Sequence, residues 1–462
     1  MGLDTVAGCS VSRAPSFPDP EAGRVVVVGA GTAGCVVAGR LAEAGYAVDL
    51  LDAGPMDFPS GDERLSATDH LQAHGVDDRW WPATTVFRGD GNSGEPSVPY
   101  LAGRGLGGSS AVNGLLADID PDDPALGPPD EVRAAIERCR LPIERPGLDE
   151  LGDLDRALLL VPGARVLDLH RSDGRRADIA LAYLRGGGDV RVIGDALVDR
   201  VAERSAVGGI TTTCVTTSSG DEFAASAVVL CAGTLHTPAI LQRSRIGLDV
   251  GIGIQGHPAV SIPLVRRPPV RRCDIVTGVA VDRGRVQLLA LDHVSSTSQP
   301  ADGPEAALLV ALMQPIAAAG TVEIVSDDPL VEPLVRLRSF ADRRDLVELR
   351  RGVRWALDTA VAELAEPIGA IAAQHHGHSL VDLGDDELSD WIRAEPGAHA
   401  HLVGGCSLGR TLDHDGRVVG ASAAYVADAS AFPRVPRTGP HLPTIVQAER
   451  LVARWCRAKM GP

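Results

Sequence analysis

The stretch RVVVVGAGTAGCVVAGRLAEAGYAVDLLD, residues 24–52, decides the fold of this chain. Four consecutive valines, Val25 to Val28, are typical of a strand that is buried on both faces of a parallel sheet. Glycines follow at once, residues 32–43 have the small side chains of a closely packed helix, and residues 47–51 predict a second strand. We therefore predict a βαβ unit of the Rossmann type, which needs only about 30 residues.

The glycines of this stretch form a GxGxxG pattern between the first strand and the helix. Gly29 permits the tight turn, Gly31 lets the backbone approach a pyrophosphate, and Gly34 allows the helix to pack against the strand. Asp52 ends the second strand, where a carboxylate accepts hydrogen bonds from an adenosine ribose. The pattern predicts a dinucleotide, with its pyrophosphate on the helix N-terminus, but it does not separate NAD from FAD. A glycine turn in an unrelated α/β fold is the alternative.

Length, composition and charge limit the remaining possibilities. The chain has 462 residues, 44% of them hydrophobic, which is enough for one large domain or two interleaved domains. The net charge of −17 repels phosphate backbones and anionic lipid surfaces, so no nucleic-acid partner is expected. Eight scattered cysteines without zinc-binding spacing predict a reducing, cytoplasmic location. No run of about 18 apolar residues occurs, so no integral membrane segment is expected.

Residues 1–22 precede the glycine-rich stretch and are expected to form a disordered tail. Val6-Ala7-Gly8-Cys9 superficially matches a lipoprotein cleavage box. The residues before it include Asp4, no basic residue and no apolar run of signal-peptide length. We therefore expect no lipid anchor at this position.

Beyond residue 52 the chain predicts long ordered loops followed by further strands. Residues 57–99 are rich in Asp, Gly and Pro without firm periodicity, so no core element is expected there. Other patterns predict strands at 189–193, 210–216, 227–233, 308–313 and 321–325, and an amphipathic helix over 343–364.

Residues 103–114 read GRGLGGSSAVNG, and here the chain resembles the glucose-methanol-choline (GMC) oxidoreductases. These proteins have a similar signature loop lying against the flavin of FAD. Glycines and serines allow backbone amides to approach a flavin ring and a pyrophosphate without obstruction. Further motifs agree in the same order along the chain: DRWWPAT at 78–84, VVLCAGTLHTP at 228–238, HLVGGCSLG at 401–409, VADAS at 426–430 and GPHLPT at 439–444.

The resemblance implies an α/β fold combined with an α+β fold. A Rossmann-like FAD-binding domain is expected to be interleaved with a substrate-binding domain that is built on an antiparallel sheet. We expect the FAD-binding domain at residues 23–117, 189–257 and 399–462, the last part carrying the active-site histidines. The substrate domain is expected at residues 118–188 and 258–398.

The resemblance also implies cofactor contacts, residue by residue. Val198 is expected to contact the adenine through its backbone, Asp428 to lie near the ribityl and pyrophosphate portion, and Leu442 to Thr444 to lie beneath the pyrimidine edge of the flavin. Family members that bind FAD covalently through this loop have a histidine where this chain has Val112, so we expect non-covalent FAD. The full expected set is Gly29, Gly31, Thr32, Ala33, Gly34, Asp52, Ala53, Arg104, Gly107, Gly108, Ser109, Asn113, Val198, Ala232, Gly233, Asp428, Ala429, Leu442, Pro443 and Thr444.

Two histidines of these motifs carry the expected chemistry. Oxidising an alcohol by hydride transfer requires removal of the hydroxyl proton, and an imidazole with an ordinary pKa of about 6.5 is a suitable base. The resemblance implies this role for His401, while His441 can hydrogen-bond the same oxygen and orient it. A structural histidine with satisfied hydrogen bonds is the alternative for either residue.

Two other groups of residues could carry different chemistry. His375-His376-Gly377-His378 could bind a metal, but no Cys or carboxylate spacing supports this, so no metal is expected. Cys231 and Cys406 lie inside the motifs and could react with the flavin. Packing in the core is the commoner fate of such thiols, and we favour it.

Within the family, the chain looks most like the mycofactocin-associated GMC dehydrogenases, on RTGPHLPT at 437–444, GHP at 256–258 and GTVEIVSDDP at 320–329. That branch implies oxidation of a small-molecule alcohol, such as the reduced redox cofactor mycofactocinol, with electrons passed to a respiratory acceptor or redox carrier. An oxygen-dependent alcohol oxidase and a non-redox flavoprotein, either a lyase or a binding protein, are the alternatives. Gly405 and Leu408 replace the usual Thr and Met, and the substrate lobe is short for the family, which leaves substrate size open.

Overall fold

The predicted parallel sheet forms the centre of one lobe. The computed structural model describes residues 17–82, 84–89, 97–205, 211–265, 273–294, 306–316, 320–360, 364, 371–372, 374–375, 378–395 and 400–456. The sheet has the strand order β24-β12-β1-β2-β8, formed by β1 (Val25–Val28), β2 (Val48–Leu51), β8 (Val190–Ile193), β12 (Ala227–Leu230) and β24 (Ala424–Val426). All neighbouring pairs run parallel, which confirms the expected Rossmann-like arrangement.

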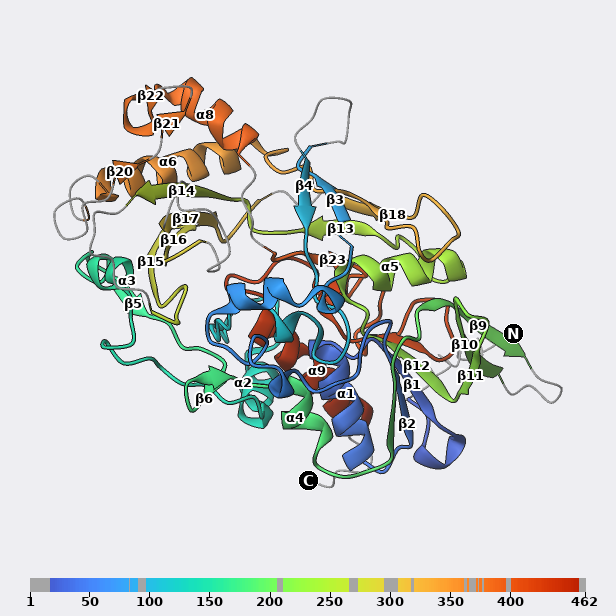
Figure 1. Ribbon diagram of the computed structural model, residues 1–462. Helices are drawn as coiled ribbons and strands as arrows, with labels where there is room; N and C mark the ends of the chain where they lie inside the picture. The colour runs from blue at the N-terminus through green and yellow to red at the C-terminus, as the bar shows by residue number, and fades with distance from the viewer. Residues whose placement is uncertain are drawn as a thin grey trace, which may run out of the picture.

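Both faces of this sheet are covered, which explains why all four valines of β1 are buried. Val25 and Val27 pack in one core, and Val26 and Val28 pack in another on the opposite face. The first core includes the helices α1 (Thr32–Glu43), α2 (Pro129–Arg138), α4 (Ile179–Leu184) and α9 (His441–Cys456). The second core includes α5 (Gly233–Ser244) and a small sheet of β9 (Val198–Ser205), β10 (Thr211–Thr217) and β11 (Glu222–Ala225) (Figure 1).

The second lobe is built on an antiparallel sheet, as expected. Its strand order is β20-β14-β17-β16-β15-β5, formed by β5 (Ala164–Val166), β14 (Ala259–Val265), β15 (Val279–Arg283), β16 (Val286–Leu291), β17 (Ala306–Leu312) and β20 (Ile371–Ala372). The helix α6 (Arg343–Thr359) packs on β16 and β17, and α8 (Asp385–Ala394) packs on α6 (Figure 1). The α-helical part of the helix expected to Leu364 ends at Thr359, Ala360 and Leu364 are π-helical, and residues 361–363 lie outside the described residues.

A third sheet corrects the expectation that residues 57–99 contain no core element. Its strand order is β23-β13-β18-β19-β3-β4, formed by β3 (Thr84–Phe87), β4 (Ser97–Tyr100), β13 (Ile252–Gln255), β18 (Gly320–Glu323), β19 (Leu334–Arg336) and β23 (Val403–Gly405). β3 and β4 form a hairpin, and β3 pairs in parallel with β19 from far along the chain. Only alternate residues of β3, such as Val86, are buried, so the strand has no local apolar run that would reveal it. Pairing with a distant strand holds it in place.

Residues 118–188 divide between the two lobes, which corrects their placement in the substrate domain alone. α2 and α4 pack against α1 and α9 in the core of the parallel sheet. The helix α3 (Asp153–Leu158) and β5 pack instead in the core of the antiparallel sheet. Two short hairpins, β6 (Arg171–Ser172) with β7 (Arg175–Arg176) and β21 (Gln374–His375) with β22 (His378–Ser379), complete the strands.

The end of the expected disordered tail is packed against the first lobe. Phe17 stacks on Trp455 of α9, with ring centroids 4.8 Å apart and planes 7° from parallel. Its ring also lies 5.7 Å from that of Tyr46 and 4.9 Å from that of Tyr425. Residues 17–22 therefore belong to the folded lobe, while residues 1–16, including the Val6–Cys9 box, lie outside the described residues.

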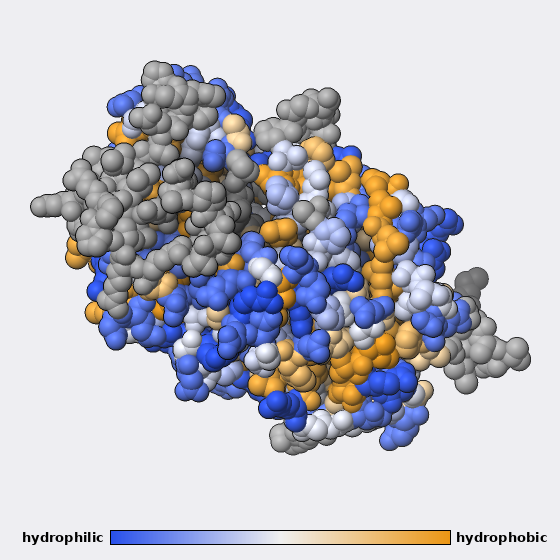
Figure 2. Space-filling view, viewed as in Figure 1, coloured by the Kyte–Doolittle hydropathy of each residue, from blue (hydrophilic) through white to orange (hydrophobic). Residues whose placement is uncertain are grey.

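The molecular surface is mixed in polarity. In the face shown, hydrophobic residues gather in a band over the side that carries α5 and β18, and polar residues cover much of the remainder (Figure 2). Leu248, which follows α5, and Val325, which follows β18, are among the exposed large apolar residues. In the described part of the chain, no helix combines the length and the apolar character needed to cross a bilayer.

Candidate active site

Four of the predicted cofactor-binding segments meet at one edge of the parallel sheet. Gly29–Gly34 follow β1, Asp52–Ala53 follow β2, Ala232–Gly233 follow β12, and Asp428–Ala429 follow β24. The strands are parallel and adjacent, so their carboxyl ends lie together. This is the edge at which open α/β sheets bind their ligands.

The glycine turn after β1 leaves no room for side chains. A Cβ on Gly34 would lie 1.8 Å from the carbonyl oxygen of Gly29, and a Cβ on Gly29 would lie 2.5 Å from the carbonyl oxygen of Cys231. No side chain caps the N-terminus of α1, whose N-cap residue is Gly31, and the first turn holds no acidic residue. Thr32 and Ala33 begin this helix, so its first amides and positive dipole end suit an anionic ligand.

The Asp52 carboxylate holds the glycine turn in place through hydrogen bonds to backbone amides. Its Oδ2 accepts a hydrogen bond from the Ala30 amide at 2.8 Å, and its Oδ1 accepts bonds from the Gly54 and Gly105 amides, each at 2.9 Å. A carboxylate has about four acceptor positions, so one position on Oδ2 is left for a ribose hydroxyl. The ribose contact itself stays a prediction.

The signature loop lies directly on the glycine turn. The Gly107 amide donates to the Ala30 carbonyl at 2.8 Å, and a Cβ on Gly108 would lie 2.7 Å from the Cα of Gly31. Gly107 has a φ of 89°, a left-handed conformation that favours glycine. The backbones of the loop and the turn, more than 70 residues apart in sequence, thus pack directly against each other.

The remaining predicted residues of this loop hold it in shape. Arg104 donates to the Ala53 carbonyl through Nε at 3.1 Å and Nη2 at 2.5 Å. Ser109 is exposed, and its Oγ accepts from the Gly103 amide at 3.1 Å. Asn113 accepts through Oδ1 from the Leu115 amide and from Arg176, so its Nδ2 is the atom left for a ligand.

Asp428 is buried, and its carboxylate is fully occupied by the protein. Oδ2 accepts from the Gly233 amide at 2.7 Å and from Thr237 Oγ1 at 2.6 Å, and Oδ1 accepts from the amide and the hydroxyl of Ser430. Four hydrogen bonds use the capacity of a carboxylate. Asp428 therefore joins the Ala232–Gly233 and Ala429–Ser430 segments, and a cofactor contact at this point falls to their backbone.

The other predicted cofactor contacts are buried in the same lobe. Val198 begins β9 and is 4% exposed. Leu442, Pro443 and Thr444 form the first turn of α9, and the Thr444 hydroxyl donates to the Pro440 carbonyl at 2.6 Å. Their contacts with adenine and flavin stay predictions.

His401 precedes β23 and is held by its neighbours on both sides. The Ala400 carbonyl accepts from the Tyr100 hydroxyl at 3.4 Å, and the Leu402 carbonyl accepts from Thr234 Oγ1 at 2.9 Å. The His401 ring contacts a second imidazole, with its Nδ1 2.9 Å from Nδ1 of His257. In the sequence His257 stands out only as part of the GHP motif, because no local pattern reveals a partner so distant in the chain.

His441 is the first residue of α9 and contacts the signature loop. Its Nε2 lies 2.6 Å from Ser110 Oγ, which in turn lies 2.7 Å from Thr32 Oγ1. Its Nδ1 is buried without a hydrogen-bond partner in the described protein. Burial, together with His170 and Arg176, holds the pKa of His441 well below its ordinary value, so the imidazole is neutral at pH 7.

The segment before α9 brings the two predicted catalytic histidines to one site. A Cβ on Gly439 would lie 3.5 Å from Cε1 and Nε2 of His401. Gly439 stands two residues before His441. The ring of His401 therefore faces the same short segment that ends in His441, and the catalytic roles of both histidines stay predictions.

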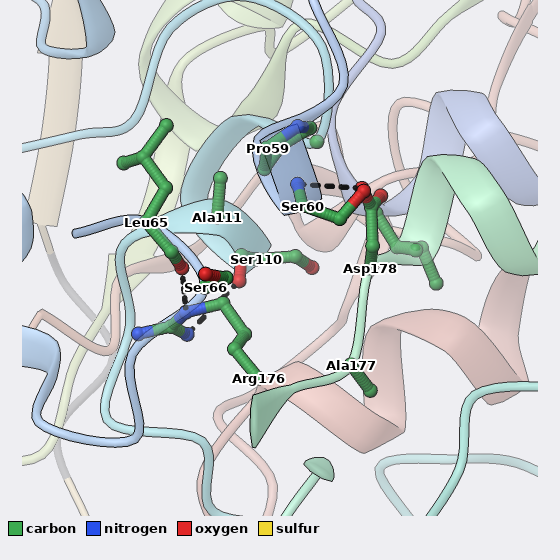
Figure 3. Close-up of a pocket in the computed structure, with 11 residues that line it drawn as sticks. Pro59, Ser60, Leu65, Ser66, Ser110, Ala111, Arg176, Ala177 and Asp178 are labelled. Carbon is green, nitrogen blue, oxygen red and sulfur yellow. Dashed lines mark hydrogen bonds between the residues drawn. The ribbon is translucent and has the colours of Figure 1, made fainter. Parts of the chain in front are cut away.

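Arg176 supplies a buried cation beneath the signature loop. It donates to the Leu65 carbonyl through Nε at 2.9 Å, and to the Ser110 carbonyl and Asn113 Oδ1 through Nη1. Its side chain lies beside a small cavity, near Leu65, Ser66 and Ser110 (Figure 3). Burial lowers the pKa of Arg176 to about 9, so it stays charged at pH 7 and favours the neutral form of His441. No sequence motif marked this residue.

Among the described residues, neither of the two competing chemistries finds structural support. In the described residues, no group of three or more His, Cys, Asp or Glu side chains is arranged to hold a metal ion. His375 and His378 pair across β21 and β22, and His376 lies outside the description. Cys231 and Cys406 are buried, and burial raises the pKa of both thiols well above the ordinary value, as in packing residues.

Proteins of known family share both the sequence and the fold. An uncharacterized GMC-type oxidoreductase of Rhodococcus erythropolis is 26% identical over 509 residues, which cover 93% of this chain and 97% of that protein. The 5-(hydroxymethyl)furfural oxidase of Methylovorus sp. (strain MP688) is 27% identical, with coverage of 92% and 97%. The crystal structure of pyridoxine 4-oxidase from Mesorbium loti superposes with a TM-score of 0.79 at 21% identity, covering 93% of this chain and 98% of that chain.

Family models match separate parts of the chain. The N-terminal model of the GMC oxidoreductases matches residues 163–259, and the C-terminal model matches residues 315–448. The second match includes His401 and His441. The two matches together span half of the chain, which is therefore an enzyme of the GMC oxidoreductase family.

Proposed function

We propose that this enzyme oxidises the CH–OH group of a small-molecule alcohol with FAD as the hydride acceptor and His401 as the general base. The observation that carries the proposal is the contact path from His441 through Ser110 to Thr32, with distances of 2.6 and 2.7 Å. This path joins a predicted catalytic residue directly to the turn predicted to bind the cofactor.

The residues at the sheet edge fit FAD. The uncapped α1 N-terminus and the Gly31–Gly108 contact offer backbone amides to a pyrophosphate, and Asp52 retains an acceptor position for a ribose hydroxyl. When bound, FAD supplies a hydride acceptor at flavin N5. Val112 is a buried aliphatic residue with no nucleophile, which supports non-covalent binding.

The base must take the hydroxyl proton as the carbon loses its hydride, because a protonated carbonyl would otherwise form. His401 is suited to this step, since its ring edge faces the segment that leads to His441. A positioned general base typically contributes a factor of roughly 10² to 10⁴ in rate. The alcohol proton therefore moves to the imidazole of His401.

His441 complements this base. Being neutral, it can hydrogen-bond the substrate oxygen through Nδ1, a buried atom that has no partner among the described residues. If Ser110 donates to its Nε2, the proton of the neutral imidazole lies on Nδ1, which then donates to the oxygen. His441 would thus orient the alcohol oxygen toward His401.

The donor is proposed to be a primary or secondary alcohol, with mycofactocinol-type reduced cofactors as a specific candidate and a non-oxygen acceptor for the electrons. The motifs at 256–258, 320–329 and 437–444 support this branch. A second candidate is an oxygen-dependent alcohol oxidase. It is supported by the names of two similar proteins, 5-(hydroxymethyl)furfural oxidase and pyridoxine 4-oxidase.

One experiment tests the function and separates the candidates. The purified flavoprotein is mixed with a panel of alcohols and a reduced redox peptide, first without and then with oxygen. The proposal expects loss of the flavin absorbance near 450 nm, roughly the region of oxidised flavin, with at least one donor and little peroxide in air. Stoichiometric peroxide would establish the oxidase instead. No bleaching with any donor would refute both, leaving a non-redox flavoprotein such as the lyases among its relatives, for example the (R)-mandelonitrile lyase-like protein of Arabidopsis thaliana.

A further inference from the structure

A buried arginine that belongs to no sequence motif packs against the signature loop, residues 103–114. Arg176, in β7, is 6% exposed. It donates to the Leu65 carbonyl through Nε at 2.9 Å, and through Nη1 to the Ser110 carbonyl at 3.1 Å and to Asn113 Oδ1 at 2.8 Å (Figure 3). Its Nη2 is buried and has no hydrogen-bond partner among the described residues. Two N–H groups of the guanidinium are therefore left unused by these residues.

No described acid balances the positive charge of Arg176. Its three acceptors are neutral, namely two backbone carbonyls and one side-chain amide. Burial lowers the pKa of Arg176 to about 9, and no acidic side chain offsets this effect. Asp178, two residues along the chain, accepts instead from the amides of Ser60, Ala180 and Leu181. Because an unpaired buried charge is costly, such a cation is suited to a site at which negative charge arrives during function.

The contacts of Arg176 also fix the direction of the Asn113 amide. Both neighbours of Oδ1 are donors, the Leu115 amide at 3.1 Å and Nη1 of Arg176 at 2.8 Å, so this atom must be the oxygen. The Nδ2 group is therefore directed away from the guanidinium, and Asn113 is partly exposed. The cation polarises this amide, so that its N–H groups become stronger donors to a ligand in front of the loop.

One residue separates Arg176 from both parts of the proposed site. The Ser110 carbonyl accepts from Arg176, while the Ser110 hydroxyl lies 2.6 Å from Nε2 of His441 and 2.7 Å from Thr32 Oγ1. Burial, followed by the charges of His170 and Arg176, lowers the pKa of His441. The charge of Arg176 therefore acts on the residue proposed to orient the alcohol oxygen, close to the N-terminus of α1.

The proposed reaction brings negative charge to this part of the molecule. The alcohol loses its hydroxyl proton to His401 and a hydride to the cofactor, so the product carbonyl is neutral and the cofactor gains one negative charge. Hydride transfer requires the reacting carbon to lie about 3–3.5 Å from the accepting atom. An oxygen held by His441 and the atom that accepts the hydride are therefore both close to Ser110. A cation already fixed behind Ser110 favours the added charge without any rearrangement.

We propose that Arg176 supplies the positive charge that favours the negatively charged, reduced cofactor. It acts across Ser110 and Asn113 and touches no reacting atom, so it is a positioning residue. The assignment rests on the proposed binding of FAD at the edge of the parallel sheet, and it does not depend on which alcohol is oxidised.

The reduction potential of the bound flavin measures this charge without any substrate. Arg176→Gln keeps an NH₂ donor for Ser110 or Asn113 but loses the charge. Against the same reference dye, the ratio of reduced to oxidised flavin should fall about tenfold, which is about 30 mV toward lower potential for a two-electron couple. Arg175→Gln removes an exposed cation at the adjacent position and is the matched control. Solvent screens a charge there, so its ratio should stay within about threefold of wild type.

Arg176→Lys separates the charge from the shape of the side chain. The burial that lowers the pKa of Arg176 to about 9 should lower that of a lysine, ordinarily about 10.4, to about 7. Compared with wild type at the same pH, the Lys variant should keep its potential at pH 6 and approach the Gln variant at pH 8.5. Arg176 also lowers the pKa of His441 and His70, but burial is the larger cause for both. These histidines therefore stay neutral at pH 6 and do not titrate in this window.

Asn113→Asp tests the same charge with Arg176 in place. The carboxylate can still accept from the Leu115 amide and from Arg176, but it balances the cation and removes the Nδ2 donors, so the potential should fall as in Arg176→Gln. This variant carries the test if Arg176→Gln does not retain its flavin.

Flavin content and the unfolding midpoint of each holoenzyme report whether the fold is retained. A wild-type potential in Arg176→Gln or in Asn113→Asp would overturn the role of the charge. A Lys variant that equals the Gln variant at both pH values would overturn it in favour of a purely structural role. If the potential follows the charge but no alcohol is oxidised, the proposed function fails and the assignment of Arg176 stands.

Discussion

Ser110 shows how much of the site depends on single residues. Its hydroxyl contacts His441 and Thr32, and its carbonyl accepts from Arg176, so one side chain joins the C-terminal helix to the dinucleotide turn. The sequence motifs predicted the two catalytic histidines and the loop that contains Ser110. They could not predict the contacts between them, because these arise only when distant segments pack together.

Removal of the Ser110 hydroxyl should lower the rate of the reaction more than it lowers the amount of bound flavin. In Ser110→Ala, Nε2 of His441 is left buried without its partner, which costs about 1–3 kcal/mol. If half of this cost appears in the transition state, kcat/KM falls about 2- to 12-fold. Ser110→Thr keeps the hydroxyl and is the matched control. Unchanged turnover in the Ala variant with full flavin content would show that the Ser110 contact does not serve catalysis.

Among the secondary structure elements, the sequence predicted those correctly whose packing partners are close to them in the chain. The valine run, the glycine turn and the helix predicted β1, α1 and β2, and all three are confirmed. The β3–β4 hairpin was missed because its strands are short, half-buried and fixed by pairing with the distant β19. His257 was missed as a site residue for the same reason, since its partner comes from the far end of the chain.

The junction of β1 and α1 allows a direct test of the turn. In Gly34→Ala the new Cβ would lie 1.8 Å from the Gly29 carbonyl oxygen, so helix and strand must separate. Overpacking of this kind costs about 1–3 kcal/mol or more, and we expect most of the bound flavin to be lost. Gly61→Ala, at a position with no atom within 4 Å of the added Cβ, is the control. The ratio of flavin to protein absorbance measures the outcome, and full occupancy in Gly34→Ala would contradict this reading of the turn.

At the scale of the whole molecule, buried histidines link stability to pH. Burial lowers the pKa of His170 and His257 to about 4 each, and both side chains are less than 5% exposed. The unfolded chain binds protons at these residues below a pH of about 6.5, whereas the folded chain does not until about pH 4. Their contribution to stability is therefore full above about pH 6.5 and is lost as the pH falls toward 4.

This linkage predicts how steeply the free energy of unfolding changes with pH between pH 6.5 and pH 4. Each of the two histidines should lower the free energy of unfolding by up to about 1.4 kcal/mol per pH unit between pH 6 and pH 5. Denaturant unfolding of the holoenzyme at several pH values measures the slope. His170→Gln should reduce it by one proton, and His414→Gln, at an exposed position, is the control substitution. An equal slope in all three proteins would show that His170 is not held neutral in the fold.

The division into two lobes was predictable from the family resemblance, but its boundaries were not. Residues 118–188 supply α2 and α4 to one core and α3 to the other, because their apolar residues are matched to helices and strands far away in sequence. The site lies where C-terminal segments pack against other parts of the molecule. The helix α9 packs on α1 beside the parallel sheet, and β23 joins the third sheet just after His401. The proposed site thus lies at the contact between parts that no local pattern connects.

The proposed role of His401 as the base for alcohol oxidation is tested by the rate of flavin reduction. This rate is measured without oxygen, against pH, with the best alcohol of the panel, in the wild-type enzyme and in His401→Asn at equal flavin content. We expect a rate that falls in acid, because a protonated imidazole cannot accept the alcohol proton, and a loss of about 10²- to 10⁴-fold in the variant. A variant that reduces its flavin at the wild-type rate would show that His401 is not the base.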